Sequence, residues 1–124
     1  MKLSLIPENL AVCRLSPDAE IPEWVPSGGF TSVTRTAEEL SIVCDEQFIP
    51  QGSQMEPGWR ALKVEGPLDF ALTGILSALV APLAKAKISI FAISTFDTDY
   101  LLIKQTALDQ AITVLAAEGH KIER

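Results

Sequence analysis

Two short segments in the second half of the chain are apolar at consecutive positions rather than at every second position. Residues 88–93 read ISIFAI, and residues 100–104 read YLLIK. A strand with one face in water alternates apolar and polar side chains, so these segments indicate a sheet that is covered on both faces. We expect helices on one face, and the first half of the chain or a second copy of the protein on the other.

The order of elements around these segments predicts an α+β fold of the ferredoxin-like type. A strand is expected at residues 59–65, a helix from Leu72, strands at residues 88–93 and 100–104, and a second helix from Thr106. Residues 121–124 are either a tail or a last short strand. This order is a βαββαβ unit, with the helices on one face of a four-stranded antiparallel sheet. The apolar stripes that indicate the helices are Leu72, Ile75, Leu76, Leu79, Val80 and Leu83, and Leu108, Ala111, Ile112 and Leu115.

The ends of the second predicted helix carry recognisable signals. Thr106 is the predicted N-cap, and Asp109 stands in the first turn, where a negative charge is favoured. Gly119 is placed to end the helix in left-handed geometry.

The first half of the chain reads as short strands separated by turns, at residues 3–6, 10–15, 30–36 and 40–44, with the last two forming a hairpin. Residues 1–58 carry 3 basic and 9 acidic side chains, whereas residues 59–124 carry 7 of each. This difference in charge predicts two modules. We expect an abbreviated N-terminal module at residues 1–57 and a C-terminal module at residues 58–124.

The charge of the chain limits its partners. With 10 Lys+Arg against 16 Asp+Glu, the net charge is −6, which gives no electrostatic basis for binding nucleic acid or an acidic membrane surface. The longest uncharged run, residues 70–84, is shorter than the about 20 residues that a membrane span needs. No secretory signal is visible, so we expect a cytoplasmic protein with Cys13 and Cys44 buried and reduced.

The sequence offers no catalytic motif. It has no nucleophile elbow, no HExxH zinc motif and no P-loop, and its single histidine, His120, has no obvious nucleophile partner. Asp97 and Asp99 are spaced like the start of a calcium loop, but the glycine and glutamate that such a loop requires are missing. We therefore expect no enzyme, no cofactor and no metal site.

Several short motifs, in their order and spacing, resemble an ACT domain. These motifs are Val64-Glu65-Gly66, Gly74-Ile75-Leu76, Ile88-Ser89-Ile90, Ile93-Ser94-Thr95 and Asp97-Thr98-Asp99-Tyr100-Leu101-Leu102. Residues 59–124 are similar to the small tandem-ACT proteins related to aspartate kinase regulatory regions and to CASTOR-type arginine sensors, and residues 30–44 resemble their N-terminal module more loosely. The resemblance implies paired ACT modules, homodimers, and regulatory binding of an amino acid at an interface between modules. These residues include no kinase or dehydrogenase domain, so any regulated protein is expected to be another chain.

The first half of a candidate ligand site is the predicted start of the first helix. Gly66, Asp69, Phe70, Ala71 and Leu72 would lie where unpaired backbone N–H groups and the helix dipole favour a carboxylate. Gly66 would let the backbone come close to a ligand. The alternative is that these are ordinary turn residues, with Asp69 capping the helix.

The second half of the candidate site is the loop between the two apolar strands. Its residues are Ser94, Thr95, Phe96, Asp97, Thr98 and Asp99. Asp97 or Asp99 could accept charge-assisted hydrogen bonds from a ligand ammonium or guanidinium group. The alternative is a polar hairpin loop whose side chains satisfy its own backbone.

Two functions from different classes remain open. The first is a regulatory module that binds a free amino acid or a similar zwitterion between two ACT modules and so biases how the modules pair. The second is a dimerisation or protein-interaction module that acts on a partner protein without any small ligand, with the acidic first half as its docking face.

Overall fold

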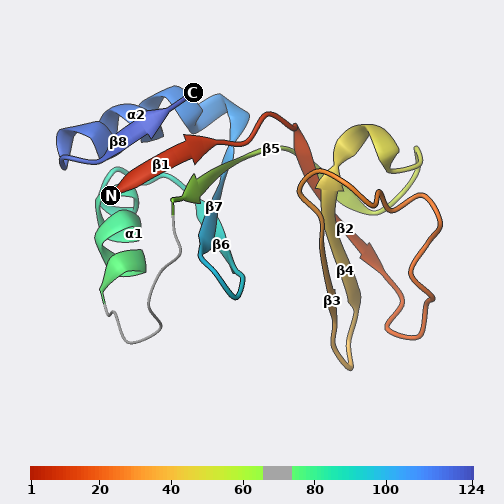
Figure 1. Ribbon diagram of the computed structural model, residues 1–124. Helices are drawn as coiled ribbons and strands as arrows, with labels where there is room; N and C mark the ends of the chain where they lie inside the picture. Colours follow the sequence, from red (N-terminus) through yellow and green to blue (C-terminus); the bar gives the residue numbers. More distant parts are fainter. Residues whose placement is uncertain (66–73) are drawn as a thin grey trace. The chain divides into compact units, whose positions relative to one another are not determined.

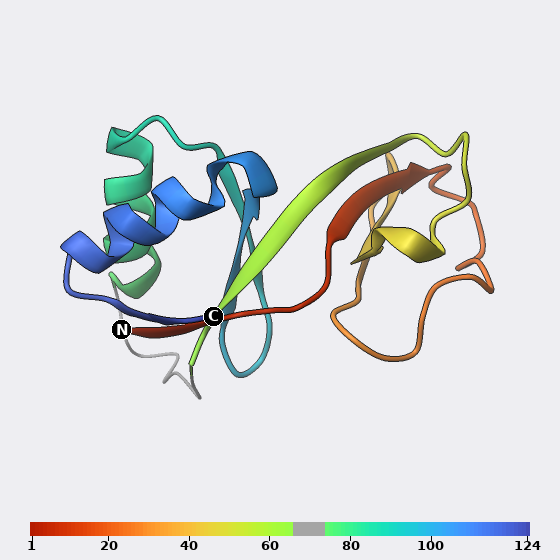
Figure 2. The same ribbon diagram turned by 90° about the horizontal axis from the view of Figure 1, so that it is seen from above.

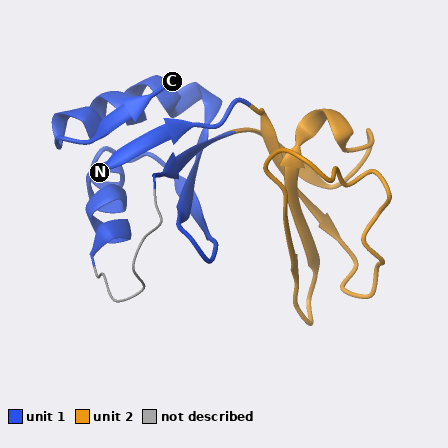
Figure 3. Cartoon of the chain, viewed as in Figure 1, with its two compact units in different colours: residues 1–7, 60–124 blue, residues 8–59 orange. Residues whose placement is uncertain are grey.

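The structure, a computed structural model, describes residues 1–65 and 74–124 (Figure 1). The chain forms two compact units (Figure 3): unit 1 consists of Met1–Pro7 and Arg60–Arg124, and unit 2 is Glu8–Trp59. Whereas the sequence analysis expected modules at residues 1–57 and 58–124, the first seven residues are part of the same unit as the second half of the chain. Unit 2 is therefore an insertion within the sequence of unit 1.

Unit 1 contains the βαββαβ elements expected of a ferredoxin-like module, in the predicted order, preceded by one further strand. They are β1 (Lys2–Leu5), the last part of β5 (Met55–Val64), α1 (Ile75–Lys85), β6 (Ile90–Ser94), β7 (Asp99–Lys104), the 3₁₀ turn η2 (Gln105–Ala107), α2 (Leu108–Ala117) and β8 (Lys121–Glu123). From β5 onward this is βαββαβ, so the predicted α+β fold is confirmed, and residues 121–123 are a strand rather than a tail.

The sheet of unit 1 has one strand more than predicted. Its order is β6–β7–β5–β1–β8, because β1 lies between β5 and β8. Leu3 of β1 is opposite Val64 of the antiparallel strand β5 and opposite Ile122 of the parallel strand β8. The prediction of a four-stranded, purely antiparallel sheet is therefore wrong, because it assigned the first strand to the N-terminal module.

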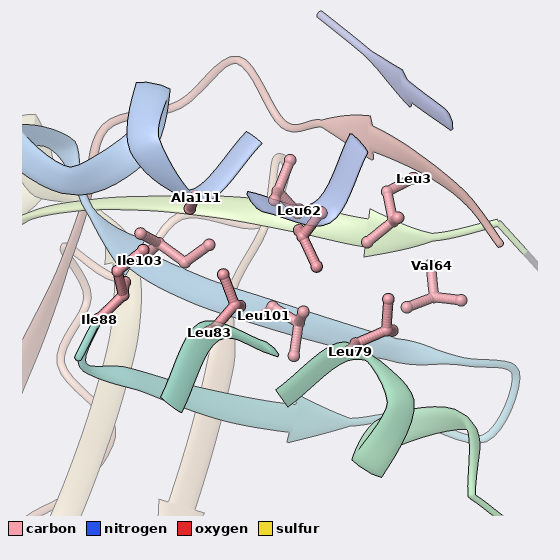
Figure 4. Packing of buried hydrophobic residues seen from close by; sticks show 10 residues of the cluster. Leu3, Leu62, Val64, Leu79, Leu83, Ile88, Leu101, Ile103 and Ala111 are labelled. Carbon is pink, nitrogen blue, oxygen red and sulfur yellow. The ribbon is translucent and has the colours of Figure 1, made fainter. Parts of the chain in front are cut away.

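Both helices lie on the same side of this sheet (Figures 1 and 2) and bury one apolar core against it. Figure 4 shows this core between α1, α2, β1, β5 and β7. Its fully or almost fully buried members are Leu3, Leu62, Val64, Leu79, Leu83, Ile88, Leu101, Ile103, Ala111 and Leu115. The stripes predicted from the sequence supply the helical members of this core, since side chains three and four positions apart share one face of a helix.

The beginnings of the two helices differ from the predictions. Thr106 is not the N-cap of α2, because it lies in η2, and α2 begins at Leu108 after Ala107 with no side-chain cap. The 3₁₀ turn leads out of β7, and Leu108, the first residue of α2, is almost fully buried. The described part of α1 begins at Ile75 after Gly74, whose φ is 79°, a left-handed conformation that favours glycine.

The end of α2 follows the prediction. Asp109 lies in the first turn, and Gly119 has φ of 90° directly after the helix. The backbone N–H of His120 donates to the Leu115 carbonyl at 3.2 Å, which satisfies one of the carbonyls that a helix end leaves open.

The face of the unit 1 sheet opposite the helices changes character from one edge to the other. Over β1 and β8 it carries charges, with Lys2 bound to Glu123 at 3.2 Å and the Ser4 hydroxyl donating to Glu65 at 2.5 Å. Ala61 and Leu102 point to the same face, since each alternates with side chains of the core, and both are fully buried. The burial of both sheet faces that the sequence predicts is therefore found at the centre of the sheet, at Ala61 and Leu102, and not at its β8 edge.

Unit 2 is a small sheet, and all of its residues are described. It contains β2 (Leu10–Leu15), β3 (Ser32–Arg35), β4 (Leu40–Asp45), the 3₁₀ turn η1 (Glu46–Phe48) and the first part of β5, in the order β3–β4–β2–β5. The predicted hairpin is confirmed as the antiparallel pair β3–β4. Because η1 is the only helical segment of this unit, its core is made by strands and loops: Ala11, Cys13, Leu40, Ile42, Cys44 and Ile49, with Trp24 and Met55 packed against them.

Replacing Leu83 by alanine tests the core of unit 1. Leu83 is fully buried in α1, so Leu83→Ala should lower the free energy of unfolding by about 2–5 kcal/mol. Ser77→Ala is the control on the exposed face of the same helix and should change it by less than about 0.5 kcal/mol. Urea unfolding followed by circular dichroism measures both, and equal effects would contradict the described packing.

The two thiols of unit 2 should be unreactive in the folded chain. Cys13 and Cys44 are free and buried, as predicted, and burial, then the neighbouring Cys13 and Asp45, raises the pKa of Cys44 to about 11. Because the thiolate is the reactive species, labelling by 5,5′-dithiobis(2-nitrobenzoate) at pH 8 should be at least about 100-fold slower than in the unfolded chain. The exposed variant Ser16→Cys is the control and should react at an ordinary rate. Fast labelling of the unmodified folded chain would show that the core is open.

Candidate functional site

The predicted site loop is a tight hairpin turn that connects β6 to β7. Ser94 and Asp99 are the last paired residues of the two strands. Inside them, the Thr95 backbone N–H donates to the Thr98 carbonyl at 2.8 Å, and the Thr95 hydroxyl donates to the same oxygen at 3.1 Å. These bonds leave Phe96 and Asp97 at the tip of the turn.

Most polar side chains of this loop hold the loop itself. The Ser94 hydroxyl donates to the Asp99 carboxylate, and the Thr98 backbone N–H donates to the Thr95 hydroxyl at 3.3 Å. Thr98 is only 5% exposed, and its hydroxyl donates to the Val64 carbonyl at the end of β5, at 2.5 Å. For these residues the structure matches the alternative that the sequence left open, a loop that satisfies its own backbone.

Ser94, Thr95, Phe96 and Asp97 are all exposed, and the last two lie at the tip of the loop, where the Asp97 side chain does not bond to the loop backbone. Phe96 is 83% exposed. Asp97 is also exposed, and within the described chain its carboxylate makes no hydrogen bond or ion pair. A carboxylate beside an aromatic ring suits an ammonium or guanidinium group, because both groups attract cations.

The other predicted half of the site lies outside the described residues. This applies to Gly66, Asp69, Phe70, Ala71 and Leu72. The nearest described residues are Glu65, which accepts a hydrogen bond from Ser4, and Gly74, which precedes α1. Because Thr98 is bonded to Val64, the hairpin loop is joined to the strand that leads into this segment.

The structure also contains a pocket that the sequence analysis did not identify. It lies within unit 2, has a volume of about 480 Å³, and is lined by Glu8, Pro26, Ser27, Gly28, Gly29, Phe30, Asp45 and Phe48. Glu8, Gly28 and Gly29 lie outside the strands that the sequence predicts, in the turns between them. The one available signal was the pair of glycines next to an aromatic residue, which is a weak indication of a site.

The described residues provide neither a metal site nor a membrane helix. Within residues 1–65 and 74–124, no three His, Cys, Asp or Glu side chains are grouped so that they could hold a metal ion. No helix in that part of the chain has the length and apolar character needed to cross a membrane.

Comparison with known families identifies the class of this protein. A family model of the ACT domain matches residues 54–117, slightly more than half of the chain. The chain therefore belongs to the ACT-domain family, in agreement with the resemblance of its motifs. A second family model, which describes an N-terminal domain, matches residues 8–52, all of them in unit 2.

Individual relatives support the same assignment. The chain is 31% identical over 100 residues to the cytosolic arginine sensor for mTORC1 subunit 1 of Bos taurus, covering 72% of this chain and 30% of that protein. A crystal structure of an Agobacterium tumefaciens protein is 42% identical, covers 98% of this chain and 90% of its own, and superposes with a TM-score of 0.92. The aspartate kinase of Clostridium acetobutylicum shares the fold, with a TM-score of 0.66 at 11% identity, over 94% of this chain and 34% of the kinase.

The share of each relative that is covered differs widely. The chain spans less than a third of the length of the arginine sensor and about a third of the kinase, but nearly all of the Agobacterium protein. Both units of this chain therefore have counterparts in that bacterial protein.

Removing the Thr98 hydroxyl tests the anchor of the loop. Thr98→Val keeps the shape of the side chain but leaves the Val64 carbonyl without this donor, so the free energy of unfolding should fall by about 1–3 kcal/mol. Thr113→Val is the matched control, because its hydroxyl bonds to the Asp109 carbonyl on the exposed face of α2, where water can replace it. Thermal or urea unfolding measures both variants, and equally small changes would show that the loop is not anchored in this way.

Proposed function

We propose that the chain is a regulatory ACT-domain protein that binds a free amino acid, or a similar zwitterion, where two ACT modules meet. The protein acts by binding and not by catalysis, in the cytoplasm. Its ligand changes how modules pair, and the modules in turn regulate a partner chain. This proposed role is more specific than what membership of the ACT-domain family alone implies.

The relatives support an amino-acid ligand without naming it for this chain. One relative bears the name of a cytosolic arginine sensor, and a kinase of the same fold is described as allosteric. Since the chain spans only a part of both, the ligand and the regulated partner are proposals that need their own test.

The observation that carries the proposal is the carboxylate of Asp97 at the tip of the β6–β7 hairpin. The other polar side chains of the loop are bonded within it or to β5, whereas Asp97 is exposed and unpaired within the described chain. In this proposal Asp97 receives the cationic group of the ligand, Phe96 lies against it, and the segment at residues 66–72 receives the ligand carboxylate.

A second candidate function is ligand-independent dimerisation. The observation that favours it is the position of β6, which pairs only with β7 among the described strands and so stands at an edge of the described sheet. Ile93 on this strand is partly exposed. A second copy could extend the sheet at this edge without any small ligand.

A thermal-shift screen of the twenty amino acids at millimolar concentration tests the proposed function. A ligand that binds only the folded chain stabilises it by about 2.7 kcal/mol at 100 times its dissociation constant, so at least one amino acid should raise the melting temperature by several degrees. Asp97→Asn should abolish most of that increase, because it removes the charge that meets the ligand cation. The melting temperature without ligand should stay unchanged, since Asp97 is exposed and unpaired.

Glu118→Gln is the control variant for this screen. It removes the same charge from another exposed position of unit 1, and the ligand-induced shift should survive. If no amino acid changes the melting temperature and calorimetry detects no heat of binding, the proposed function is wrong. A dimer that light scattering detects without added amino acid, and that Asp97→Asn leaves intact, would favour the second candidate.

A further inference from the structure

The pocket of unit 2 is lined by two carboxylates and by no basic side chain. Glu8 and Asp45 supply the carboxylates, while Pro26, Phe30 and Phe48 supply apolar surface. Both oxygens of Asp45 accept hydrogen bonds from Gln47, at 3.1 Å from its backbone N–H and 3.0 Å from its side chain. Because these donors are neutral, they orient the carboxylate without cancelling its charge.

One oxygen of the Glu8 carboxylate, Oε2, is buried without a hydrogen bond, which is rare for a charged group. Removing a carboxylate oxygen from water without a donor is unfavourable, so a site of this kind gains from a ligand that brings an N–H group.

The two arginines of unit 2 bond to groups that do not line the pocket. Residues 8–59 contain 2 basic and 9 acidic side chains, a net charge of −7. Arg35 donates to the carbonyls of Pro17 and Ala19, and Arg14 donates to the Glu38 carbonyl at 3.0 Å and lies 3.7 Å from the Glu39 carboxylate. Neither arginine therefore neutralises the carboxylates of the pocket, and the surrounding excess of negative charge attracts a cation to it.

Gly29 is what leaves room for the Glu8 side chain. A Cβ atom at this position would lie 2.9 Å from Glu8 Oε1, closer than such contacts occur, and the residue has φ of 68°. At Gly28, by contrast, an added Cβ would meet nothing within 4 Å. A side chain at residue 29 would therefore displace the Glu8 carboxylate from its observed position, and the positive φ of this residue also favours glycine.

We propose that this pocket binds a small organic cation, a primary ammonium or guanidinium group carried on a short apolar chain. Glu8 and Asp45 receive the charged group, and the exposed ring of Phe48 contacts the cation and the apolar chain. Two carboxylates alone are a poor site for Ca²⁺ or Mg²⁺, which require six or more oxygen ligands. The apolar walls favour an organic cation over either metal ion.

The test uses ¹⁵N-resolved NMR of the full chain, with n-butylammonium and agmatine as probes and n-butanol as the neutral control. At millimolar concentration the two cations should shift the amide resonances of Gly28, Gly29 and Phe48, and the affinity should fall as salt is added. Equal shifts with n-butanol, or binding of Mg²⁺ in place of the organic cations, would overturn the proposal.

The variants Glu8→Gln and Glu20→Gln make a matched pair. Both remove one negative charge from unit 2, but Glu20 is exposed and does not line the pocket. Glu8→Gln should weaken binding of the cations at least about 10-fold, because a charge-assisted hydrogen bond is lost, and Glu20→Gln should change it less than about 2-fold. The same spectra report whether each variant is folded, and equal effects of the two variants would contradict a site at Glu8.

The proposed cation site in unit 2 and the proposed amino-acid site at the hairpin loop can be refuted independently of each other. Asp97→Asn should leave cation binding to unit 2 unchanged, and the probes should not shift resonances of residues 94–99. Cation-induced shifts confined to residues 94–99 would refute the pocket proposal. A negative result with the pocket probes would have no bearing on an amino acid that raises the melting temperature through Asp97.

Discussion

The fold depends on the antiparallel pairing of β1 with the last part of β5. Leu3, Ser4 and Leu5 lie opposite Val64, Lys63 and Leu62, so the first residues of the chain complete the sheet that the last residues build. The strand β8 then pairs with β1 and not directly with β5. Without β1, the three-residue strand β8 would have no neighbour in this sheet, and Leu3 would be missing from the core. Unit 2 is therefore inserted in the sequence between two strands, β1 and the last part of β5, that pair with each other in unit 1.

Local patterns predicted the elements that local physics determines. The stripe of leucines in α1 and the hairpin of β3 and β4 could be found because periodicities of 3.6 and 2 are properties of single elements. The place of β1 could not be found in this way, since a strand of four residues has no local mark of the partner it will join. The start of α2 was missed for a related reason. Thr106 is a good cap in isolation, but burying Leu108 favours a 3₁₀ turn before the helix.

In the candidate loop, too, the sequence predicts which residues form the turn, but only the structure shows which of their side chains are available to a ligand. The sequence alone gives no reason to assign different roles to the short polar side chains of this turn, which are Ser94, Thr95, Asp97, Thr98 and Asp99. The structure separates them by burial and bonding, because Thr98 is buried against β5 while Asp97 points to no partner within the described chain. A polar side chain that holds a loop and one that is available to a ligand differ only in what surrounds them, and surroundings are a product of the fold.

The exposure of Asp97 has a consequence for the kind of ligand that its loop can hold. Two unit charges 4 Å apart attract by about 1 kcal/mol in water, and by about 4 kcal/mol at the effective dielectric constant of a protein surface. A carboxylate surrounded by water cannot hold a small cation by itself, so a ligand at the hairpin must be gripped at a second point, as the two charged ends of an amino acid allow. The carboxylates of the unit 2 pocket are partly removed from water, and the nearby negative charges of unit 2 reinforce them. A single cationic group would be enough there, so the two proposed sites would select different ligands.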